Sequence, residues 1–542
     1  MMGVAEVAAW ATWTLLVSTV LGYVAYWIRH RRHQHALFQR LGIPYVPPHL
    51  IYGNNHSLRH QGVLPTEVIG RWMKQYGKVF GYYVGWQPNL VVADLDLVRE
   101  ILVREFPTFA NRPTLVIDAM PVVDCLVGLR DQRWKDVRSV LAPTFSLVKM
   151  KYMSGIMNER MNELLSIVSK KAERGEPIEW HAAYQAMTLD VICECALALK
   201  THCQRDQEGD DFFLSVRQFL RNAMNTAIFL ALYFKVFAKF LGFVSNRLAY
   251  SGRMTMLIVN HLKTVIADRR RDLSTKHLDV LQLMLDESQA TPDKCAQTTD
   301  ESSPNENNST SDLKRESKKL TDEEIIANAW VFVIAGFETT SNTVTYMSYL
   351  LAVHPEVQER VYQEMCDVLQ DSPEELTYEQ VHSLKYLDQV FCETLRLYPP
   401  AVDFVSRESS QDIQLGDLFI PKNVMIQIPL WHIHRDPDQW PDVETFDPER
   451  FCPEARANCT RHPMAYIPFG AGPRNCPGIR FGQLEAKLAV ARVIRRFKLV
   501  AYEDTPLPLN FKIPTVTLNP SGSVLMRAVP RTGSFPVSPQ AV

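Results

Sequence analysis

Residues 469–478, Phe-Gly-Ala-Gly-Pro-Arg-Asn-Cys-Pro-Gly, form a glycine-punctuated loop that places Cys476 just before an apolar helix predicted to begin near Ile479. The glycines permit turns and close backbone approach that side chains would block. Backbone N–H groups at a helix N-terminus stabilise negative charge on sulfur, and Arg474 adds a cation two residues away. The loop therefore looks built to present a thiolate, the form of cysteine that binds metals. The alternative is a buried structural cysteine in a turn.

A second group of chemically capable residues lies in a long apolar segment. Residues 321–324, Thr-Asp-Glu-Glu, are a capping box, and the run after them continues without proline to about Val353. This pattern predicts a helix of roughly thirty residues that crosses the core. Its middle carries residues 335–340, Ala-Gly-Phe-Glu-Thr-Thr, and buried polar groups of this kind are costly unless they have a role.

Three residues of this motif are candidates for catalysis. Gly336 leaves room beside the helix for a ligand. The hydroxyl of Thr339 can bond back to a backbone carbonyl, distort the helix and bind water or dioxygen. Glu338 can feed protons to that position. The alternative is a patch of hydroxyl side chains that packs one helix against another.

The loop at 469–478 resembles the haem-ligand loop of the cytochrome P-450 family, in which a cysteine thiolate is the proximal ligand of haem iron. The motif on the long helix resembles the family's oxygen-activation site on the distal side of the haem. The resemblance covers residues 40–528 and implies a cytochrome P-450 fold, mainly α with small β-sheets (α+β), behind an N-terminal transmembrane helix. It implies haem (iron protoporphyrin IX) as cofactor, Cys476 as the iron ligand, and Phe469 and Arg474 as haem-binding residues.

Further haem contacts follow from the resemblance. Trp134 and Arg138 stand four residues apart and share one face of a predicted helix, which resembles the family's helix that holds the haem propionates. Arg112 is a candidate of the same kind. Arg407 resembles another propionate contact once one extra residue is allowed after Arg396. For the first pair, the alternative is a surface aromatic–cation contact.

One further group is expected to be structural. Glu393 and Arg396 lie three residues apart on a predicted helix, which alone is worth little. The sequence Phe-Asp-Pro-Glu-Arg-Phe at 446–451 follows at the family's distance. We therefore expect Arg450 to join Glu393 and Arg396 in a buried network that fixes the segment before the cysteine loop.

The composition limits the possible partners and domains. The 542 residues have a formal net charge of −2 and are 22% charged, so no global basic field points to nucleic acid. Ten scattered cysteines suggest reduced thiols in a cytosolic environment. We expect one catalytic domain at 51–528, interrupted by a disordered polar insertion at 288–320 and followed by a flexible tail at 529–542.

The N-terminus reads as a membrane anchor. Residues 7–28 carry no charge, and as a helix they would span about 33 Å, enough for a hydrocarbon core of about 30 Å. Three arginines follow, which puts the rest of the chain in the cytoplasm. A cleaved signal peptide is the alternative, but the run is too long and its basic flank lies on the C-terminal side. We expect a single-pass anchor at 1–28, a basic and proline-rich stiff linker at 29–50 and, by resemblance, the endoplasmic reticulum membrane.

A second apolar stretch lies at about 211–250, where Lys235 and Lys239 interrupt many aliphatic and aromatic residues. It is too charged at its centre to span a membrane. It suits an amphipathic segment that dips into lipid or lines a hydrophobic substrate entrance. An ordinary core helix is the alternative.

The reaction implied by the resemblance is the insertion of one oxygen atom from O2 into a hydrophobic small molecule that is xenobiotic, steroid or fatty-acid-like. Electrons would come from NADPH through a cytochrome reductase, with cytochrome b5 as a further candidate donor. Basic residues could form a proximal docking face for an acidic reductase, or simply a solvated helix surface. They are Arg133, Lys135, Arg492, Arg495, Arg496 and Lys498.

Two other functions stay open. Finer matches resemble the animal group that holds liver drug oxidases and thromboxane synthase, an isomerase that lacks a threonine where this chain has Thr339. A similar isomerase of a prostaglandin endoperoxide would use Cys476 without a reductase. A non-catalytic haem-binding sensor would have no use for Glu338 and Thr339. The predicted pocket segments are apolar without a distinctive polar anchor, so they do not name a substrate.

Overall fold

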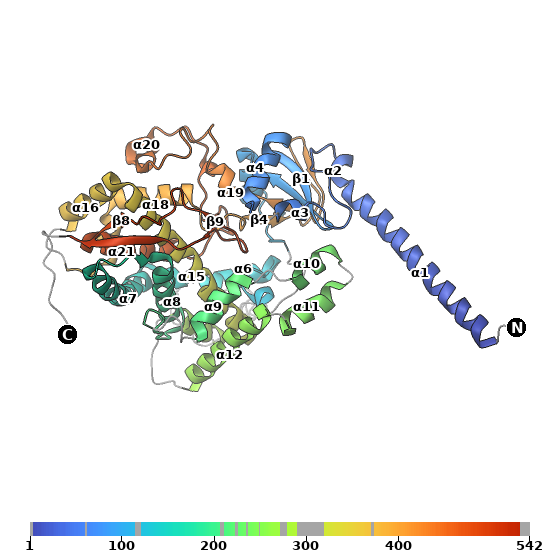
Figure 1. The fold of residues 1–542 in the computed structure, drawn as a ribbon, viewed down its shortest axis with the longest axis horizontal. Coiled ribbons are helices and arrows are strands. Elements are labelled where there is room, and N and C mark those ends of the chain that lie inside the picture. The colour runs from blue at the N-terminus through green and yellow to red at the C-terminus, as the bar shows by residue number, and fades with distance from the viewer. Residues whose placement is uncertain are drawn as a thin grey trace, which may run out of the picture.

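The computed structural model describes residues 4–59, 62–113, 121–205, 211–222, 226–234, 237–248, 250–271, 279–289, 319–369 and 373–531. The predicted insertion at 288–320 and the predicted tail at 529–542 fall mostly outside these residues. One long helix, α1, projects from a body of helices with small sheets (Figure 1). The predicted fold class is confirmed.

The helices of the N-terminal half are α1 (Val4–His35), α2 (Leu37–Arg40), α3 (Asn55–Leu58), α4 (Pro65–Tyr76), α5 (Leu95–Arg99), α6 (Asp131–Leu141), α7 (Leu147–Glu173), α8 (Trp180–Leu197), α9 (Asp211–Asn222), α10 (Thr226–Tyr233), α11 (Ala238–Leu248) and α12 (Tyr250–Arg271). They are followed by α13 (Val280–Gln289), α15 (Asp322–Val353), α16 (Pro355–Leu369), α17 (Tyr378–Ser383), α18 (Lys385–Leu397), α19 (Leu430–Ile433), α20 (Pro453–Ala457) and α21 (Ile479–Arg496).

The strands are β1 (Val79–Val84), β2 (Gln87–Val92), β3 (Ile178–Glu179), β4 (Ser406–Glu408), β5 (Ile413–Leu415), β6 (Leu418–Ile420), β7 (Met425–Gln427), β8 (Phe497–Ala501), β9 (Phe511–Lys512), β10 (Asn519–Pro520) and β11 (Leu525–Pro530). They pair as β1-β2-β7-β4, β3-β11-β8, β5-β6 and β10-β9.

The four-stranded sheet lies at the end of the body from which α1 projects (Figure 1). β1 and β2 form an antiparallel hairpin with a two-residue turn, and the positive φ of Gly85 suits that turn. β7 then pairs in parallel with β2 and brings a distant part of the chain beside it. The hairpin is followed by α5 and then by a π-helical turn, Glu100–Arg104.

α15 runs through the helical body (Figure 1), and most of its residues are buried. Its capping box is formed as predicted: the Glu324 N–H donates to Thr321 Oγ1 (3.2 Å), and the Thr321 N–H donates to Glu324 Oε2 (2.9 Å). The helix ends at Val353, the predicted residue. A helix that is apolar on most sides needs neighbours on most sides, and α8, α18 and α21 all pack against α15.

The N-terminal segment differs from the predicted anchor and linker. α1 continues to His35, and its part from Trp10 to His35 is long and apolar enough to cross a membrane. The region from 29 to 50 was expected to be a stiff linker, but its part after α1 is anchored in the body through Phe38, Ile43 and Val46, each at most 9% exposed. Phe38 is 1% exposed and lies so close to Gly81 of β1 that a Cβ there would be 2.2 Å from its ring. Burial of these apolar side chains holds the segment in the core.

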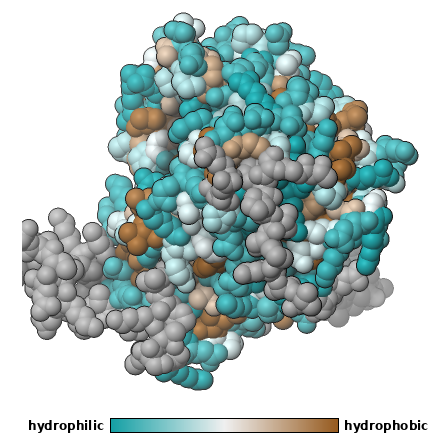
Figure 2. Space-filling model, turned by 90° about the vertical axis from the view of Figure 1, so that its left-hand side faces the viewer, coloured by the Kyte–Doolittle hydropathy of each residue, from teal (hydrophilic) through white to brown (hydrophobic). Residues whose placement is uncertain are grey.

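The stretch predicted as lipid-dipping or entrance-lining folds into α9, α10, α11 and the start of α12. α10 lies beside the end of α1, where the Trp27 and Phe234 rings stack with centroids 6.3 Å apart. By contrast, the face at the opposite end of the molecule from α1 is mainly hydrophilic, with small separate hydrophobic areas (Figure 2). Large apolar side chains of α10, α11 and the turn between them are exposed: Leu230, Phe237, Phe240 and Phe243.

Candidate functional site

The cysteine loop is closed by hydrogen bonds of its own backbone. The Cys476 N–H donates to the carbonyl of Phe469 (2.9 Å), and α21 begins at Ile479 as predicted. Gly472 has φ +70°, and a Cβ at this position would lie 1.9 Å from the carbonyl oxygen of Leu102 in the π-helical turn. Only glycine satisfies both conditions, so this residue fixes how closely the loop approaches that turn.

The sulfur of Cys476 is accessible although protein surrounds it. Its side chain is exposed, yet desolvation raises the pKa of the thiol above its usual value. The Gly478 N–H and the charges of Arg138 and Arg112 act in the opposite direction and lower this pKa. The thiol therefore faces an internal opening, with an N–H group and two cations placed to favour the thiolate.

Arg474 has a different place from the one expected. Its Nε donates to the carbonyl of Ala110 (2.7 Å), Nη2 to that of Leu129 (2.8 Å) and Nη1 to that of Leu126 (3.4 Å). Its guanidinium also lies 4.2 Å from the ring centre of Trp134. Arg474 thus ties the cysteine loop to the segment before α6, and the cations that act on the thiol are the two arginines named above.

α6 brings the predicted pair to the same place. Trp134 is buried beneath Arg474, and Arg138 Nη2 donates to Asn475 Oδ1 (3.1 Å), directly beside the cysteine. Desolvation lowers the pKa of Arg138, whereas the charge of Cys476 raises it. The pair therefore adjoins the cysteine loop and is no solvated surface contact.

Arg407 is buried and Arg112 is half-buried, and neither has an acidic partner in the described part of the chain. The Nε atom of each is buried and makes no hydrogen bond. Burial, together with the charge of Arg112, lowers the pKa of Arg407 to about 9, and burial lowers the pKa of Arg112 to about 10. Uncompensated buried charge is costly, so these guanidinium groups fit an anionic ligand. A macrocycle that carries two carboxylates and a thiolate-bound metal has groups that match these two arginines and the cysteine.

On α15, the motif predicted for oxygen chemistry opens at a single turn. From Glu324 to Val353, Ala335 is the only exposed residue of α15, and Thr339 Oγ1 donates to its carbonyl (2.7 Å). This is the back-bond that the sequence predicts. Glycine is needed at position 336 for helix packing and not, as expected, to leave room for a ligand. A Cβ there would lie 2.8 Å from the side chain of Ile192 on α8. The glycine lets two helices pack closely, and the exposed face beside it belongs to Ala335.

Glu338 lies next to this open turn and is held from the C-terminal segment. Its Oε2 accepts a hydrogen bond from the hydroxyl of Thr517 (2.8 Å). Burial raises the pKa of Glu338, while hydrogen bonds from Thr517 and Asn519 lower it. The carboxyl group is thus a buried acid with defined donors.

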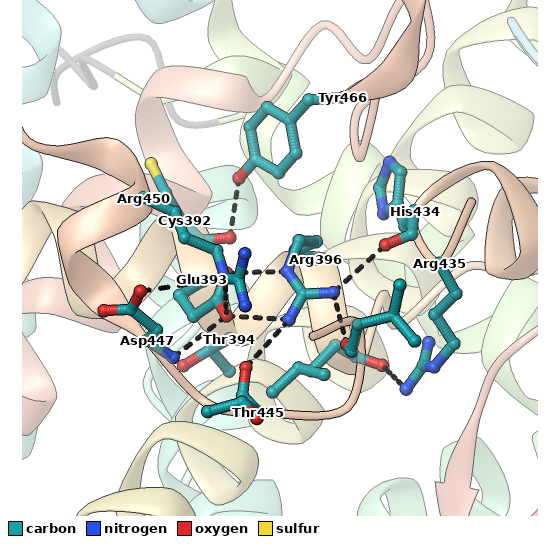
Figure 3. Close-up of polar contacts among 12 residues, drawn as sticks. Cys392, Glu393, Thr394, Arg396, His434, Arg435, Thr445, Asp447, Arg450 and Tyr466 are labelled. Carbon is teal, nitrogen blue, oxygen red and sulfur yellow. Dashed lines mark hydrogen bonds and ion pairs between the residues drawn. The ribbon is translucent and has the colours of Figure 1, made fainter. Parts of the chain in front are cut away.

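The predicted network of Glu393, Arg396 and Arg450 is present (Figure 3). Arg396 Nε and Nη2 each donate to Glu393 at 2.7 Å, and Arg450 Nε lies 3.4 Å from the same carboxylate. The remaining donors of Arg396 reach the carbonyls of Val443 (2.7 Å) and Thr445 (3.1 Å). This bidentate, fully buried pair pins the 443–450 segment to α18.

The network continues into the cysteine loop through His434. The carbonyl of His434 accepts from Arg396 Nη1 (3.2 Å), and its Nε2 accepts from the Ile467 N–H (3.1 Å). Burial lowers the pKa of His434 to about 3, which keeps this nitrogen an acceptor. The Gly470 N–H then bonds to the Ile467 carbonyl (2.8 Å). The connection to the loop was expected, but neither His434 nor Thr517 was predicted as a site residue. The signal that could have identified His434 is the His-Arg-Asp-Pro run at 434–437.

The expected basic docking face is only partly present. Arg133 is paired with Glu324 of the capping box, through Nε at 2.6 Å. Arg492 and Arg495 are 1% and 6% exposed and donate to the carbonyls of Asn158 and Pro373, so they are not surface cations. Lys135 and Lys498 are exposed, because each lies on the outer face of its element.

Comparison with known proteins settles the family. The chain matches the family model Cytochrome P450 over residues 43–526. It belongs to the cytochrome P450 family. Similar proteins include Cytochrome P450 3A29 of Sus scrofa, 32% identical over 96% of this chain and 97% of the relative. Thromboxane-A synthase of Sus scrofa is 32% identical over 91% of this chain and 93% of its own length, and Cytochrome P450 3A5 of Homo sapiens is 32% identical over 97% of both.

Membership in this family makes the protein a P450 enzyme, one of the haem- and iron-dependent monooxygenases, and confirms the resemblance drawn from the sequence. The relatives fall in the group expected from its finer matches. The arginines without acidic partners and the accessible thiol fit the cofactor that the family implies.

Proposed function

We propose that this P450 is a membrane-anchored enzyme that inserts one atom of O2 into hydrophobic small molecules, with electrons from NADPH through a cytochrome reductase. The observation that carries this proposal is the arrangement on α15. Thr339 bonds back to Ala335 at the one open turn, and Glu338 stands beside it as a buried acid. An oxygenase needs proton delivery at this position, whereas an isomerase does not.

Haem, when bound, supplies the binding and reduction of dioxygen. Cys476 would bind its iron, and the Gly478 N–H, Arg138 and Arg112 would hold the thiolate charge. Arg112 and Arg407, whose Nε atoms are free, would bind the propionates, together with Trp134 and Arg138. Phe469 and Arg474 would hold the loop in place.

The exposed turn at Ala335 would leave space for dioxygen and substrate. The Thr339 hydroxyl would hold water there, and Glu338 would replace each proton used. Thr339 and Glu338 would together form the proton path to this position.

The direct test uses the full-length protein in phospholipid nanodiscs with reductase, NADPH and isotopically labelled dioxygen. Dodecanoic acid, progesterone and 7-ethoxycoumarin represent the three substrate classes. We expect at least one product that carries one labelled oxygen and requires NADPH. The opposite outcome is that no product carries the label and that a prostaglandin endoperoxide rearranges rapidly without NADPH. That outcome would favour an isomerase similar to thromboxane-A synthase.

The membrane attachment we propose has two parts. α1 would span the endoplasmic reticulum membrane once, and the exposed side chains of α10 and α11 would enter the lipid surface beside it. The contact between Trp27 and Phe234 supports this, because it places α10 next to the end of α1. Deletion of residues 1–28 should release most of the protein from membranes without loss of haem. Complete release would argue against the second contact.

We propose that the reductase docks on the outer side of the cysteine loop, on a surface that differs from the one expected from the sequence. Lys135 and Arg480 are exposed there, beside exposed apolar residues at the start of α7: Leu147, Val148 and Tyr152. Phe145 connects the start of α7 with the start of α21, since its ring centre lies 6.1 Å from that of Phe481 on α21. Lys135→Glu should raise the KM for reductase more than Lys498→Glu does, and cytochrome b5 should compete for the same surface.

A further inference from the structure

Four hydrogen bonds between side chains form a continuous chain that ends at Glu338. At the half-buried start of α8, His181 Nε2 lies 2.9 Å from Oδ1 of Asn342 on α15. Asn342 Nδ2 donates to Asn519 Oδ1 (3.2 Å), and Asn519 Nδ2 donates to Thr517 Oγ1 (3.1 Å). The Thr517 hydroxyl then donates to Glu338 Oε2 (2.8 Å). The site described above gives no role to His181 or Asn342.

The direction of this chain is fixed by two backbone carbonyl groups. The Leu518 carbonyl lies 2.8 Å from Asn342 Nδ2, and the Thr517 carbonyl lies 3.3 Å from Asn519 Nδ2. A carbonyl accepts hydrogen bonds and never donates them, so each amide must place its NH2 group there. The amide oxygen of Asn342 then faces His181, which donates through Nε2. Every donor in the chain consequently points toward the buried acid.

The orientation of the Asn519 amide decides where the Thr517 hydroxyl points. A hydroxyl has a single hydrogen to donate. Asn519 presents its NH2 group to Oγ1, which leaves that hydrogen for Glu338. If the amide turned over, its oxygen would face Thr517 and compete for the same hydrogen. Asn342 opposes this turn, because its own NH2 group would then face the NH2 group of Asn519.

The residues of this chain that lie nearest to Glu338 are buried. Asn342 is 0% exposed, and Thr517 and Asn519 are 6% and 5% exposed, so a turned amide would leave a hydrogen bond unmade away from water. Desolvation raises the pKa of Glu338, and the hydrogen bonds from Thr517 and Asn519 lower it. The titratable neighbour Tyr346 stays neutral, since burial raises its pKa well above the usual value. The chain is therefore what stabilises the ionised form of this acid.

Resting on the proposed function, in which Glu338 delivers protons, we propose that Asn342 is a positioning residue of that delivery. Together with Asn519 it turns the Thr517 hydroxyl toward Glu338, and His181 completes the chain at the start of α8. A donor that already points at an acid stabilises its charge without rearrangement each time the acid releases a proton. The alternative is that the chain only joins the C-terminal segment to α15.

The experiment replaces Asn342 by leucine, which keeps the size of the side chain and removes its donor. Asn328→Leu is the matched control, since Asn328 is equally buried on the same helix. The amide of Asn328 bonds instead to the Leu126 N–H (2.9 Å) and to the Glu324 carbonyl (2.7 Å). The pKa of Glu338 is measured in the haem-loaded, full-length protein in detergent, from the infrared band of its protonated carboxyl group. Loss of this band in Glu338→Gln assigns it, and urea unfolding gives the stability of each variant.

We expect Asn342→Leu to raise the pKa of Glu338 by roughly half a unit, because the Thr517 hydroxyl is then shared with Asn519. The double variant with Asn342→Leu and Thr517→Val should give the same pKa as Thr517→Val alone, since Asn342 acts through that hydroxyl. Asn328→Leu should lose stability and leave the pKa unchanged. The positioning role is overturned by an unchanged pKa in Asn342→Leu, by an equal shift in Asn328→Leu, or by a shift that adds to that of Thr517→Val.

The histidine provides a second, milder pair of variants. His181→Gln keeps an N–H donor for Asn342 Oδ1, whereas His181→Leu removes it. The pKa of Glu338 should rise in His181→Leu, by less than in Asn342→Leu, and should stay at the wild-type value in His181→Gln. Equal pKa values in the two His181 variants would contradict the chain.

These readouts do not depend on turnover, so they separate this proposal from the proposed function. Labelled oxygen in the products of a protein whose Glu338 pKa does not respond to Asn342→Leu would refute the positioning role alone. A shifted pKa in a protein that forms no labelled product would refute the oxygenase function and, with it, the delivery of protons that Asn342 is proposed to serve.

Discussion

The hydroxyl of Thr517 donates a hydrogen bond to Oε2 of Glu338 over 2.8 Å, joining the C-terminal segment to the middle of α15. This bond stabilises the ionised form of a buried acid whose pKa is raised by desolvation. Thr517→Val should therefore raise the pKa of Glu338 further, by roughly one unit for one charge-assisted hydrogen bond. If Glu338 feeds protons, product formed per NADPH in Thr517→Val should hold to about one pH unit higher than in the wild type. Thr517→Ser should behave as the wild type, and superimposable profiles for all three would remove Glu338 from proton delivery.

Thr339 distinguishes an oxygenase from an isomerase. Its hydroxyl bonds to the Ala335 carbonyl at the open turn of α15, where it can also hold water. Loss of a proton-delivery group typically costs about 10²–10⁴ in rate. Thr339→Ala should consume NADPH and release peroxide with little product, while Thr339→Ser keeps its coupling. Unchanged coupling in Thr339→Ala would show that this hydroxyl is not needed.

Arg396 should be irreplaceable by lysine. Its side chain is fully buried, and its guanidinium meets Glu393 at two 2.7 Å contacts and also three backbone carbonyls. One ammonium group cannot reproduce this fork, so Arg396→Lys should lose about 3–5 kcal/mol of folding free energy and most of its haem. Urea unfolding and the haem-to-protein ratio measure both. Arg174→Lys, at an exposed pair, should change stability by less than about 1 kcal/mol; equal effects of the two changes would contradict the network's role.

Glu485 predicts a pH dependence of stability. It is 1% exposed on α21, neither carboxyl oxygen has a partner in the described part of the chain, and burial raises its pKa well above the usual value. Because the folded state holds this proton more tightly, the wild type loses stability relative to Glu485→Gln as pH rises above about 4.5, by roughly 1.4 kcal/mol per pH unit until the folded-state pKa is reached. Urea unfolding of both proteins at pH 5 and pH 7 should show a widening gap. A constant gap would mean that Glu485 titrates normally.

Local patterns predicted the parts of the fold that depend on neighbouring residues. The capping box at Thr321 and the start of α21 at Ile479 are each set by a few adjacent side chains. The network of Glu393, Arg396 and Arg450 was also predictable, because spacing within α18 and a nearby motif define it.

Contacts between distant segments were not predictable in the same way. The packing of Gly336 on Ile192, the ties of Arg474 to three carbonyls, and the burial of Arg492 depend on which helices meet. The prediction of a stiff linker at 29–50 failed because it, too, depended on distant contacts. Apolar side chains of this region pack against strands far from it in the chain.

The central claim is that Cys476 supplies the thiolate for haem iron. The most direct test is the carbon monoxide difference spectrum of the reduced full-length protein, in the wild type, in Cys476→Ala and in Cys459→Ala, which changes another exposed cysteine. The wild type and Cys459→Ala should both give the thiolate-type Soret band, and Cys476→Ala should lose it. Retention of that band in Cys476→Ala would show that another residue binds the iron and would contradict the account of the site.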